Sequence, residues 1–253
     1  MGTKLHPEDA MLREGLEKLG VDAPERIFSP LVRYIEEIEL FNPAYGLVKV
    51  KDREELIVKH ILDSLAPLEI IGRVLNERFL AMAGSGAGAE TRGGQTVWHI
   101  ADVGSGAGLP GIPLAVCMPG AEFTLIERMG RRAGFLRDAL AVLGLSNVRV
   151  EETEMENFAQ NQAGAGRFDL VVFRAFRPLE PAILRGLLGL LGPGGIIAAY
   201  KGRREAVEEE MARLFRAREE TPFPSVGGWE ALPLDVPFLK EERQLLLMRP
   251  GTG

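Results

Sequence analysis

The stretch Val97-Trp-His-Ile-Ala-Asp-Val-Gly-Ser-Gly-Ala-Gly-Leu-Pro-Gly111 decides how the rest of the chain is interpreted. Its first seven residues are mostly apolar, with one acid, Asp102, and three alternating glycines follow, Gly104, Gly106 and Gly108. An apolar stretch comes next, with a proline near its start, where a helix tolerates it. Glycines let the main chain turn tightly and approach a ligand, and the helix start offers free N–H groups. The order strand, glycine turn, helix therefore predicts a cofactor site on a parallel sheet.

Two features further along the chain support a nucleotide-binding interpretation of this turn. The next apolar run, 121–126, is followed by Glu127, which lies 25 residues after Asp102. An acid at the end of a second strand can accept hydrogen bonds from both ribose hydroxyls of an adenosine-containing cofactor. A second glycine-rich segment, 191–195, leads into the strand-like run 196–200. These patterns leave open whether the cofactor is a dinucleotide or S-adenosylmethionine.

The bulk composition narrows the class of protein. A chain of 253 residues allows one large domain, or one domain with a small appendage. No apolar run approaches the roughly 20 residues of a membrane helix, and the polar N-terminus lacks a secretory apolar core. Cys117 is the only cysteine, and the three histidines, His6, His60 and His99, lack metal-ligand spacing. We expect a cytoplasmic protein that acts as a monomer, with no metal and no membrane partner.

The net charge of −6 describes the average field of the protein and does not exclude binding to nucleic acid. A nucleic-acid-binding protein needs only one local basic face. Acids gather in blocks such as 151–156 and 208–210, whereas bases cluster near the predicted site. These bases could form one rim at the carboxyl ends of the strands, or could simply be the wet faces of helices. The predicted RNA-binding residues are Arg131, Arg132, Arg137, Arg177, Lys201 and Arg203.

Composition divides the chain into three parts. Residues 1–82 are expected to form a cap of three helices, the last of them after the capping pattern Asp52-x-x-Glu55. The pair Asn42-Pro43 is expected to end the second helix. Residues 83–96 hold five glycines and few large apolar side chains, so we expect a linker there. Residues 97–250 form the third part, the predicted domain that carries the glycine turn.

From residue 97 onward, apolar runs alternate with helical patterns, which implies an α/β fold with a parallel sheet and helices on both faces. Prolines and glycines break any helix in the last third, where 232–236 and 244–248 favour an antiparallel pair at the sheet edge. A mostly parallel, Rossmann-like sheet with an antiparallel terminal hairpin fits a class I methyltransferase better than a dehydrogenase. Strands are predicted at 97–103, 121–126, 147–151, 168–173 and 195–200, and helices at 109–118, 129–143, 178–191 and 204–217.

Several segments within about residues 25–248 resemble one known family. Lys59-His-Ile-Leu-Asp-Ser64 resembles its Arg-His-Ile-Leu-Asp-Ser, and 102–114 is similar to its long cofactor motif, whose Leu-Pro-Gly-Ile-Pro extension is unusually specific. The family is RsmG, also called GidB, the bacterial methyltransferases of small-subunit ribosomal RNA. Tyr45-Gly-Leu-Val48 departs from the family's usual Tyr-Asn-Leu-Thr, and the glycine-rich linker replaces a usually short connection. The remaining matches, in the family's order, are Phe168-Asp169, Arg174-Ala-Phe176, Tyr200-Lys-Gly202 and Glu242-Arg243.

The resemblance implies transfer of a methyl group from S-adenosylmethionine to N7 of a guanosine in the 530 loop of 16S rRNA, guanosine 527 in the family's usage. The implied partner is 16S rRNA or the small ribosomal subunit. The sulfonium of the cofactor activates the methyl group. Guanine N7 has a free lone pair and no proton to remove, so no general base is required. The protein must instead align N7, methyl carbon and sulfur in line and exclude water.

Placement and resemblance together give the expected site. The glycines are expected beneath the methionine and ribose, Asp102 orders the turn or meets the methionine amine, and Glu127 binds the ribose. His60 and Asp63 share a helix face and could orient the site or form a structural pair. The predicted cofactor-binding residues are Asp102, Gly104, Ser105, Gly106, Gly108, Leu109, Glu127, Arg128, Met155, Glu156 and Arg174. The predicted catalytic residues, each of which could also be a surface ion pair, are Arg174, Lys201 and Arg243.

Other functions remain open from the residues alone. A class I methyltransferase acting on a small molecule or a protein would keep the cofactor residues and leave the arginines solvated. A Rossmann dehydrogenase fits less well, because Gly104-x-Gly106-x-Gly108 lacks the G-x-G-x-x-G spacing. A non-catalytic ribosome-assembly factor would retain the fold and bind RNA without turnover. Methyl transfer to ribosomal RNA distinguishes these alternatives.

Overall fold

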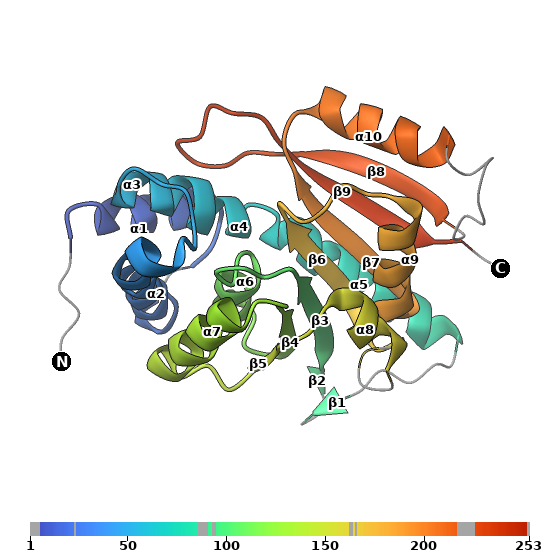
Figure 1. The fold of residues 1–253 in the computed structure, drawn as a ribbon, viewed down its shortest axis with the longest axis horizontal. Coiled ribbons are helices and arrows are strands. Elements are labelled where there is room, and N and C mark those ends of the chain that lie inside the picture. Colours follow the sequence, from blue (N-terminus) through green and yellow to red (C-terminus); the bar gives the residue numbers. More distant parts are fainter. Residues whose placement is uncertain are drawn as a thin grey trace.

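The apolar runs predicted as strands form one seven-stranded sheet in the order β5-β4-β3-β6-β7-β9-β8. The computed structural model describes residues 6–22, 24–85, 91–92, 95–161, 164, 166–216 and 226–251. Figure 1 shows the sheet with helices on both faces. The strands are β3 (Trp98–Val103), β4 (Ala121–Ile126), β5 (Val148–Glu151), β6 (Phe168–Arg174), β7 (Leu191–Lys201), β8 (Val226–Leu234) and β9 (Arg243–Pro250). A separate pair joins β1 (Thr91–Arg92) to β2 (Gln95–Thr96).

Strand register brings the predicted site residues to one edge of the sheet. β3 lies between β4 and β6 and is parallel to both, so their carboxyl ends meet at the same edge. β9 is antiparallel to both β7 and β8, and Lys201 at the end of β7 pairs with Gln244 at the start of β9. The prediction of a mostly parallel sheet with an antiparallel terminal hairpin is confirmed. The second hairpin strand, β9, inserts next to β7 and leaves β8 at the edge.

Each face of the sheet has its own hydrophobic cluster, because successive strand residues point to opposite sides. Ile100 and Val172 face the helices that precede β5 in the chain, whereas Ala101 and Val171 face the later ones. The first group contains α1 (Asp9–Lys18), α2 (Glu25–Tyr45), α5 (Leu68–Ser85), α6 (Gly111–Cys117) and α7 (Gly130–Leu143). The second contains α8 (Met155–Gln160), α9 (Pro181–Leu190) and α10 (Arg204–Arg216).

Several predicted helix boundaries need correction. α2 continues through Pro43 to Tyr45, because Gly46, in the left-handed conformation, ends it instead. The helix predicted from 109 begins at Gly111, since the preceding residues belong to the glycine turn. The third cap helix is α3 (Arg53–Leu56), a π-helical stretch η1 (Ile57–Leu62) and α4 (Asp63–Leu65) in succession. Such π stretches are frequent at functional sites.

The predicted linker falls partly outside the described residues. α5 continues to Ser85, and the short strands β1 and β2 take up four positions of the segment, while 86–90 and 93–94 lie outside the described part. The division at 82 and 96 therefore stays a prediction. Within the described residues, the helices of the cap and the sheet share one hydrophobic cluster.

A buried arginine joins α5 to the amino-terminal side of the sheet. Arg78 Nε donates to Asp169 Oδ1 at 3.0 Å, and the other oxygen of Asp169 accepts the main-chain N–H of His99 at 2.8 Å. The guanidinium also donates to the carbonyl of Pro193. Arg78 is 8% exposed, so this charge pair lies in the protein interior, where losing one partner is costly.

We expect Arg78→Met to lower the free energy of unfolding by about 3 kcal/mol, because it leaves the Asp169 carboxylate buried without its counter-charge. Denaturant unfolding followed by circular dichroism measures the change. Arg73→Met is the matched control, since Arg73 is an exposed arginine on the same helix. An equal loss in both variants would contradict the role of the buried pair.

Candidate functional site

Two cavities lie at the carboxyl edge of the parallel strands. The loop pocket, of ≈ 420 Å³, is lined by Gly104, Glu127 and Phe176 among others. The arginine cleft, of ≈ 690 Å³, is lined by Arg174, Lys201, Arg243 and residues of the cap. The segment Ala175–Arg177 lines both cavities and forms the wall between them. A ligand bound in the loop pocket would meet a ligand bound in the arginine cleft at this wall.

The glycine turn brings bare backbone to the loop pocket. Gly104, Gly106 and Gly108 have φ of +68°, +59° and +93°, a region that side chains disfavour. A Cβ on Gly104 would lie 2.4 Å from Cδ2 of Phe176, so only glycine fits under that ring. Ala175, at the start of the wall, has φ of +50°, a rare conformation for a residue other than glycine.

Glu127 fixes the glycine turn and faces the loop pocket. Its Oε2 accepts the N–H of Gly106 at 2.9 Å, and its Oε1 accepts the N–H of Met129 at 2.8 Å. The residue is 4% exposed, so the carboxylate is held in one orientation by two backbone donors. Each oxygen retains acceptor capacity, which suits a pair of ribose hydroxyls.

Asp102 lies beneath the same turn. Its Oδ2 accepts the N–H of Gly111 at 2.9 Å, and its main-chain carbonyl accepts the Ser105 hydroxyl at 2.8 Å. Burial raises the pKa of the Asp102 carboxyl to about 7. Its second oxygen, Oδ1, is buried and has no hydrogen-bond partner among the residues that the structure describes. Asp102 therefore orders the turn, as one of its two predicted roles requires, and offers an unused acceptor beneath it.

The cap also supports the glycine turn. The Tyr34 hydroxyl, on α2, donates to the carbonyl of Ala107 at 2.6 Å, across 73 positions of sequence. Burial raises the pKa of this tyrosine well above its usual value, which keeps the hydroxyl a donor. Tyr200, which ends the apolar part of β7, donates in the same way to the carbonyl of Ser64 at 2.8 Å.

These features fit S-adenosylmethionine. A carboxylate with spare acceptor capacity and glycines that expose backbone match a ribose diol. The buried acid beneath them, with one oxygen that has no partner among the described residues, matches a positively charged amino-acid group. The residues that line the pocket and would hold the cofactor are Gly104, Glu127 and Arg128, with Gly106 and Asp102 in the turn and beneath it.

The arginine cleft is built around the buried carboxylate of Asp63. Arg174 Nη1 donates to Asp63 Oδ2 at 2.8 Å and to the carbonyl of Lys59 at 3.0 Å. Arg243 Nε donates to Asp63 Oδ1 at 3.1 Å. The second guanidinium nitrogen of Arg174, Nη2, lies 2.8 Å from His60 Nδ1. Burial and the positive charge of Arg174 lower the pKa of His60 to about 3, so the imidazole is neutral at physiological pH.

Lys201 lies on another wall of the arginine cleft, at the end of β7. Its ammonium donates to Glu210 Oε2 at 2.6 Å and lies 5.7 Å from the centre of the Phe173 ring. The other oxygen of Glu210 accepts the N–H of Leu179 at 3.0 Å. Both charged side chains are mostly buried, so this ion pair is part of the cleft wall.

The structure brings some predicted cofactor residues into the loop pocket and places others elsewhere. Gly104, Glu127 and Arg128 line the pocket, whereas Arg174 lines the arginine cleft. Met155 packs in the core against α9, where a Cβ on Gly186 would approach its sulfur at 2.5 Å. Predicted residues that line neither cavity and form the turn and its support are Asp102, Ser105, Gly106, Gly108 and Leu109.

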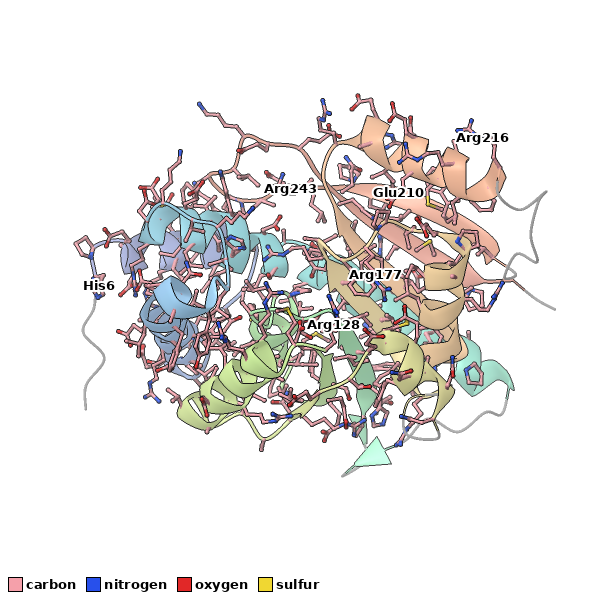
Figure 2. The ribbon with its side chains drawn as sticks, in the orientation of Figure 1. His6, Arg128, Arg177, Glu210, Arg216 and Arg243 are labelled. Atoms are coloured by element: carbon pink, nitrogen blue, oxygen red, sulfur yellow. The ribbon has the colours of Figure 1, made fainter. Side chains whose placement is uncertain are left out.

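Two bases of the predicted rim, Arg137 and Arg177, and the neighbouring Arg128 are paired with the acidic block that follows β5. Arg177 donates to Glu156 at 2.5 Å, Arg137 donates to Glu152 at 2.9 Å, and Arg128 lies 3.8 Å from Glu154. Arg128 and Arg177 lie close together in Figure 2, and both line the loop pocket. The sequence showed both charge blocks but not that they face each other.

Sequence reasoning gave no role to several residues that the structure places at the site. Phe176 forms the wall and covers Gly104, and Tyr34 supports the turn. Gln244 lines the arginine cleft, and its buried Oε1 has no partner within the described part of the chain. The Arg-Ala-Phe motif was the available signal for Phe176. Tyr34 and Gln244 had none, because their roles depend on contacts with distant segments.

Within the described residues, no helix is long and apolar enough to cross a membrane. Across those same residues, no group of three or more His, Cys, Asp or Glu side chains is arranged to hold a metal ion.

Comparison with known proteins identifies the family. A model of GidB, described as rRNA small subunit methyltransferase G, matches residues 27–91 and 89–222. The ribosomal RNA small subunit methyltransferase G of Treponema denticola is 37% identical over 254 aligned positions, covering 95% of this chain and 94% of that protein. Its counterpart from Stenotrophomonas maltophilia is 36% identical, covering 94% and 92%.

A solved structure shows the same fold over nearly the whole chain. A putative O-methyltransferase from Klebsiella pneumoniae superimposes with a TM-score of 0.56 at 16% identity, covering 96% of this chain and 97% of that one. The predicted family, class I fold and cofactor are thereby confirmed. The chain belongs to the rRNA small subunit methyltransferase G family and is an S-adenosylmethionine-dependent methyltransferase.

Proposed function

We propose that this protein methylates N7 of a guanosine in the 530 loop of 16S rRNA, in the cytoplasm, as a monomer and without a metal. The observation that carries the proposal is the shared wall, Ala175–Arg177, between the loop pocket and the arginine cleft. A cofactor in the first and a base in the second would meet there. Family relatives named for ribosomal RNA support the choice of substrate.

On the cofactor side, the role of this protein is to hold and orient S-adenosylmethionine. Glu127 would accept the ribose hydroxyls, and the backbone of Gly104 and Gly106 would pass close to the ligand. When bound, S-adenosylmethionine supplies a methyl group already activated by its sulfonium. Met155 lies in the core, so any contribution it makes to the adenine site is through the position of the neighbouring backbone. Glu156 would act through Arg177, its ion-pair partner.

On the substrate side, the chain positions the base and moves no proton. The carboxylate of Asp63 is occupied by two arginines, and His60 is a weak base with a pKa lowered to about 3 and its Nδ1 facing Arg174, so neither is placed to act as a general base. Guanine N7 needs none, because its lone pair is free. The catalytic contribution is therefore alignment and exclusion of water, which can be worth roughly 7–11 kcal/mol at its ideal limit.

The three predicted catalytic residues keep distinct roles in this proposal. Arg174 is locked to the cap and shapes the cleft, Arg243 closes its other side, and Lys201 gives it positive charge near the end of β7. Arg131, Arg132, Arg137 and Arg203 would contact phosphates outside the cleft, and Arg177 would do so at its wall. The ion pairs that Arg137 and Arg177 make with glutamates are exposed and weak, so RNA phosphates can replace these glutamates.

The experiment that tests the proposal is transfer of labelled methyl from S-adenosylmethionine to small ribosomal subunits and to 16S rRNA from cells lacking this enzyme. The modified base is then mapped by cleavage at 7-methylguanosine. We expect one modified guanosine, in the 530 loop. Binding of the cofactor with transfer only to proteins or small molecules would overturn the substrate assignment and favour the alternative methyltransferase.

Replacing Glu127 by glutamine is expected to weaken cofactor binding by about tenfold or more, because one charge-assisted acceptor is lost and an amide N–H faces a backbone donor. Calorimetric titration with S-adenosylhomocysteine measures it. Glu122→Gln, near the amino end of the same strand β4, is the matched control and should bind normally. Unchanged affinity in Glu127→Gln would remove this residue from the cofactor site.

The double variant Arg131→Gln/Arg132→Gln is expected to bind 16S rRNA several-fold more weakly. The slope of log Kobs against the logarithm of the salt concentration should be smaller in magnitude by about 1 to 2. Each arginine–phosphate contact that is lost means about one fewer counterion released on binding. Filter binding across a salt series measures both. Arg249→Gln is the control, because its neighbour Met248 pairs with Ile197, toward the opposite edge of the sheet. Equal slopes in wild type and the double variant would contradict an RNA surface here.

A further inference from the structure

The contact between Arg174 and His60 fixes the proton position on the imidazole. A guanidinium can only donate hydrogen bonds, so an imidazole nitrogen 2.8 Å from Arg174 Nη2 must accept. That nitrogen is Nδ1, which therefore carries no proton. Because a neutral imidazole has one N–H, the proton lies on Nε2.

The second nitrogen of His60 is available to a ligand. His60 lines the arginine cleft, and its Nε2 makes no hydrogen bond to any of the residues that the structure describes. The ring is also held in place, because Arg174 is itself fixed by Asp63 and by the carbonyl of Lys59. The cleft thus presents one oriented, uncharged N–H donor.

A single neutral donor suits recognition of guanine at this position. Guanine carries an acceptor, O6, beside N7, whereas adenine carries a donor, the N6 amine, in the same place. A bidentate arginine would occupy both O6 and N7 and so block the lone pair that must attack. An imidazole N–H can hold O6 alone and leave N7 exposed. It cannot accept the adenine amine, because its only acceptor nitrogen is taken by Arg174.

We propose that His60 is a specificity-determining residue whose Nε2–H donates to O6 of the target guanine and so selects guanine over adenine. Arg174 is then the positioning residue that sets the tautomer and orientation of His60. This inference rests on the proposed function, because it requires a guanine in the arginine cleft.

The test uses full-length 16S rRNA assembled by ligation with guanosine, inosine or 2-aminopurine at the target position. Inosine keeps O6, and 2-aminopurine lacks it while keeping N7. Three proteins are compared: wild type, His60→Asn and His60→Gln. Asparagine places its amide near the Nδ1 position, where it can still accept from Arg174 but cannot reach the base. Glutamine can place an N–H near the Nε2 position.

For the wild type we expect kcat/KM to fall at least about tenfold from guanosine to 2-aminopurine and much less to inosine. In His60→Asn, the guanosine rate should fall while the 2-aminopurine rate changes little, so the ratio between the two substrates becomes at least several-fold smaller than in the wild type. His60→Gln should restore part of the discrimination between guanosine and 2-aminopurine that His60→Asn loses. The intrinsic reactivity of each base cancels when ratios are compared between proteins.

A merely structural role of His60 would lower both rates together and leave the wild-type ratio in His60→Asn, and that result would overturn the proposal. Nitrogen NMR of the imidazole in the wild-type protein gives a second readout that needs no activity. A protonated Nδ1 would also overturn it. Absence of methyl transfer to the guanosine RNA by the wild type would instead overturn the proposed function, and the role of His60 with it.

Discussion

One buried carboxylate holds the reaction site together. Asp63, 4% exposed, accepts hydrogen bonds from Arg174 on β6 and Arg243 on β9, which lie 111 and 180 positions away in sequence. Burying a carboxylate is favourable only when its charge is compensated, so the cap, the middle of the sheet and the terminal hairpin must all be in place. The arginine cleft therefore exists only in the assembled fold. Removing Asp63 would leave both guanidinium groups without their shared counter-charge.

The same dependence extends to the cofactor side through the cap. Tyr34 donates to Ala107 in the glycine turn, and Tyr200 donates back to Ser64 in the cap, so each part stabilises the other. These hydroxyls are fully buried, and an unmade hydrogen bond there would be costly. The helices before the sheet thus act as one wall of the site and as a support for the loop. An independent, detachable cap would provide neither.

What could be predicted from the sequence was local. The glycine turn, the acid after β4 and the alternation of strands and helices each follow from short segments, and the structure has them where the patterns put them. The partners of Asp63 could not be predicted, although its shared helix face with His60 could, because pairing depends on which strand ends meet. Met155 was expected to bind the cofactor, from its position after a strand and from the family resemblance, yet it points into the core. A shift of one or two positions decides whether a side chain after a strand faces the core or the ligand. A single Met among acidic residues belongs to no repeating apolar pattern that would show which.

The paired charges at the rim reconcile the proposed RNA surface with the net charge of −6. Glutamates of the block after β5 neutralise Arg137 and Arg177 in the free protein. Since exposed ion pairs contribute little, exchanging a glutamate for a phosphate costs little as well. An isolated anion gains almost nothing from one such exchange. A polynucleotide makes several exchanges at once with one loss of translational freedom, so the rim favours long, regularly charged ligands over small acidic metabolites. Specificity for the reacting base then has to come from the cleft, where the donors are few, buried and fixed.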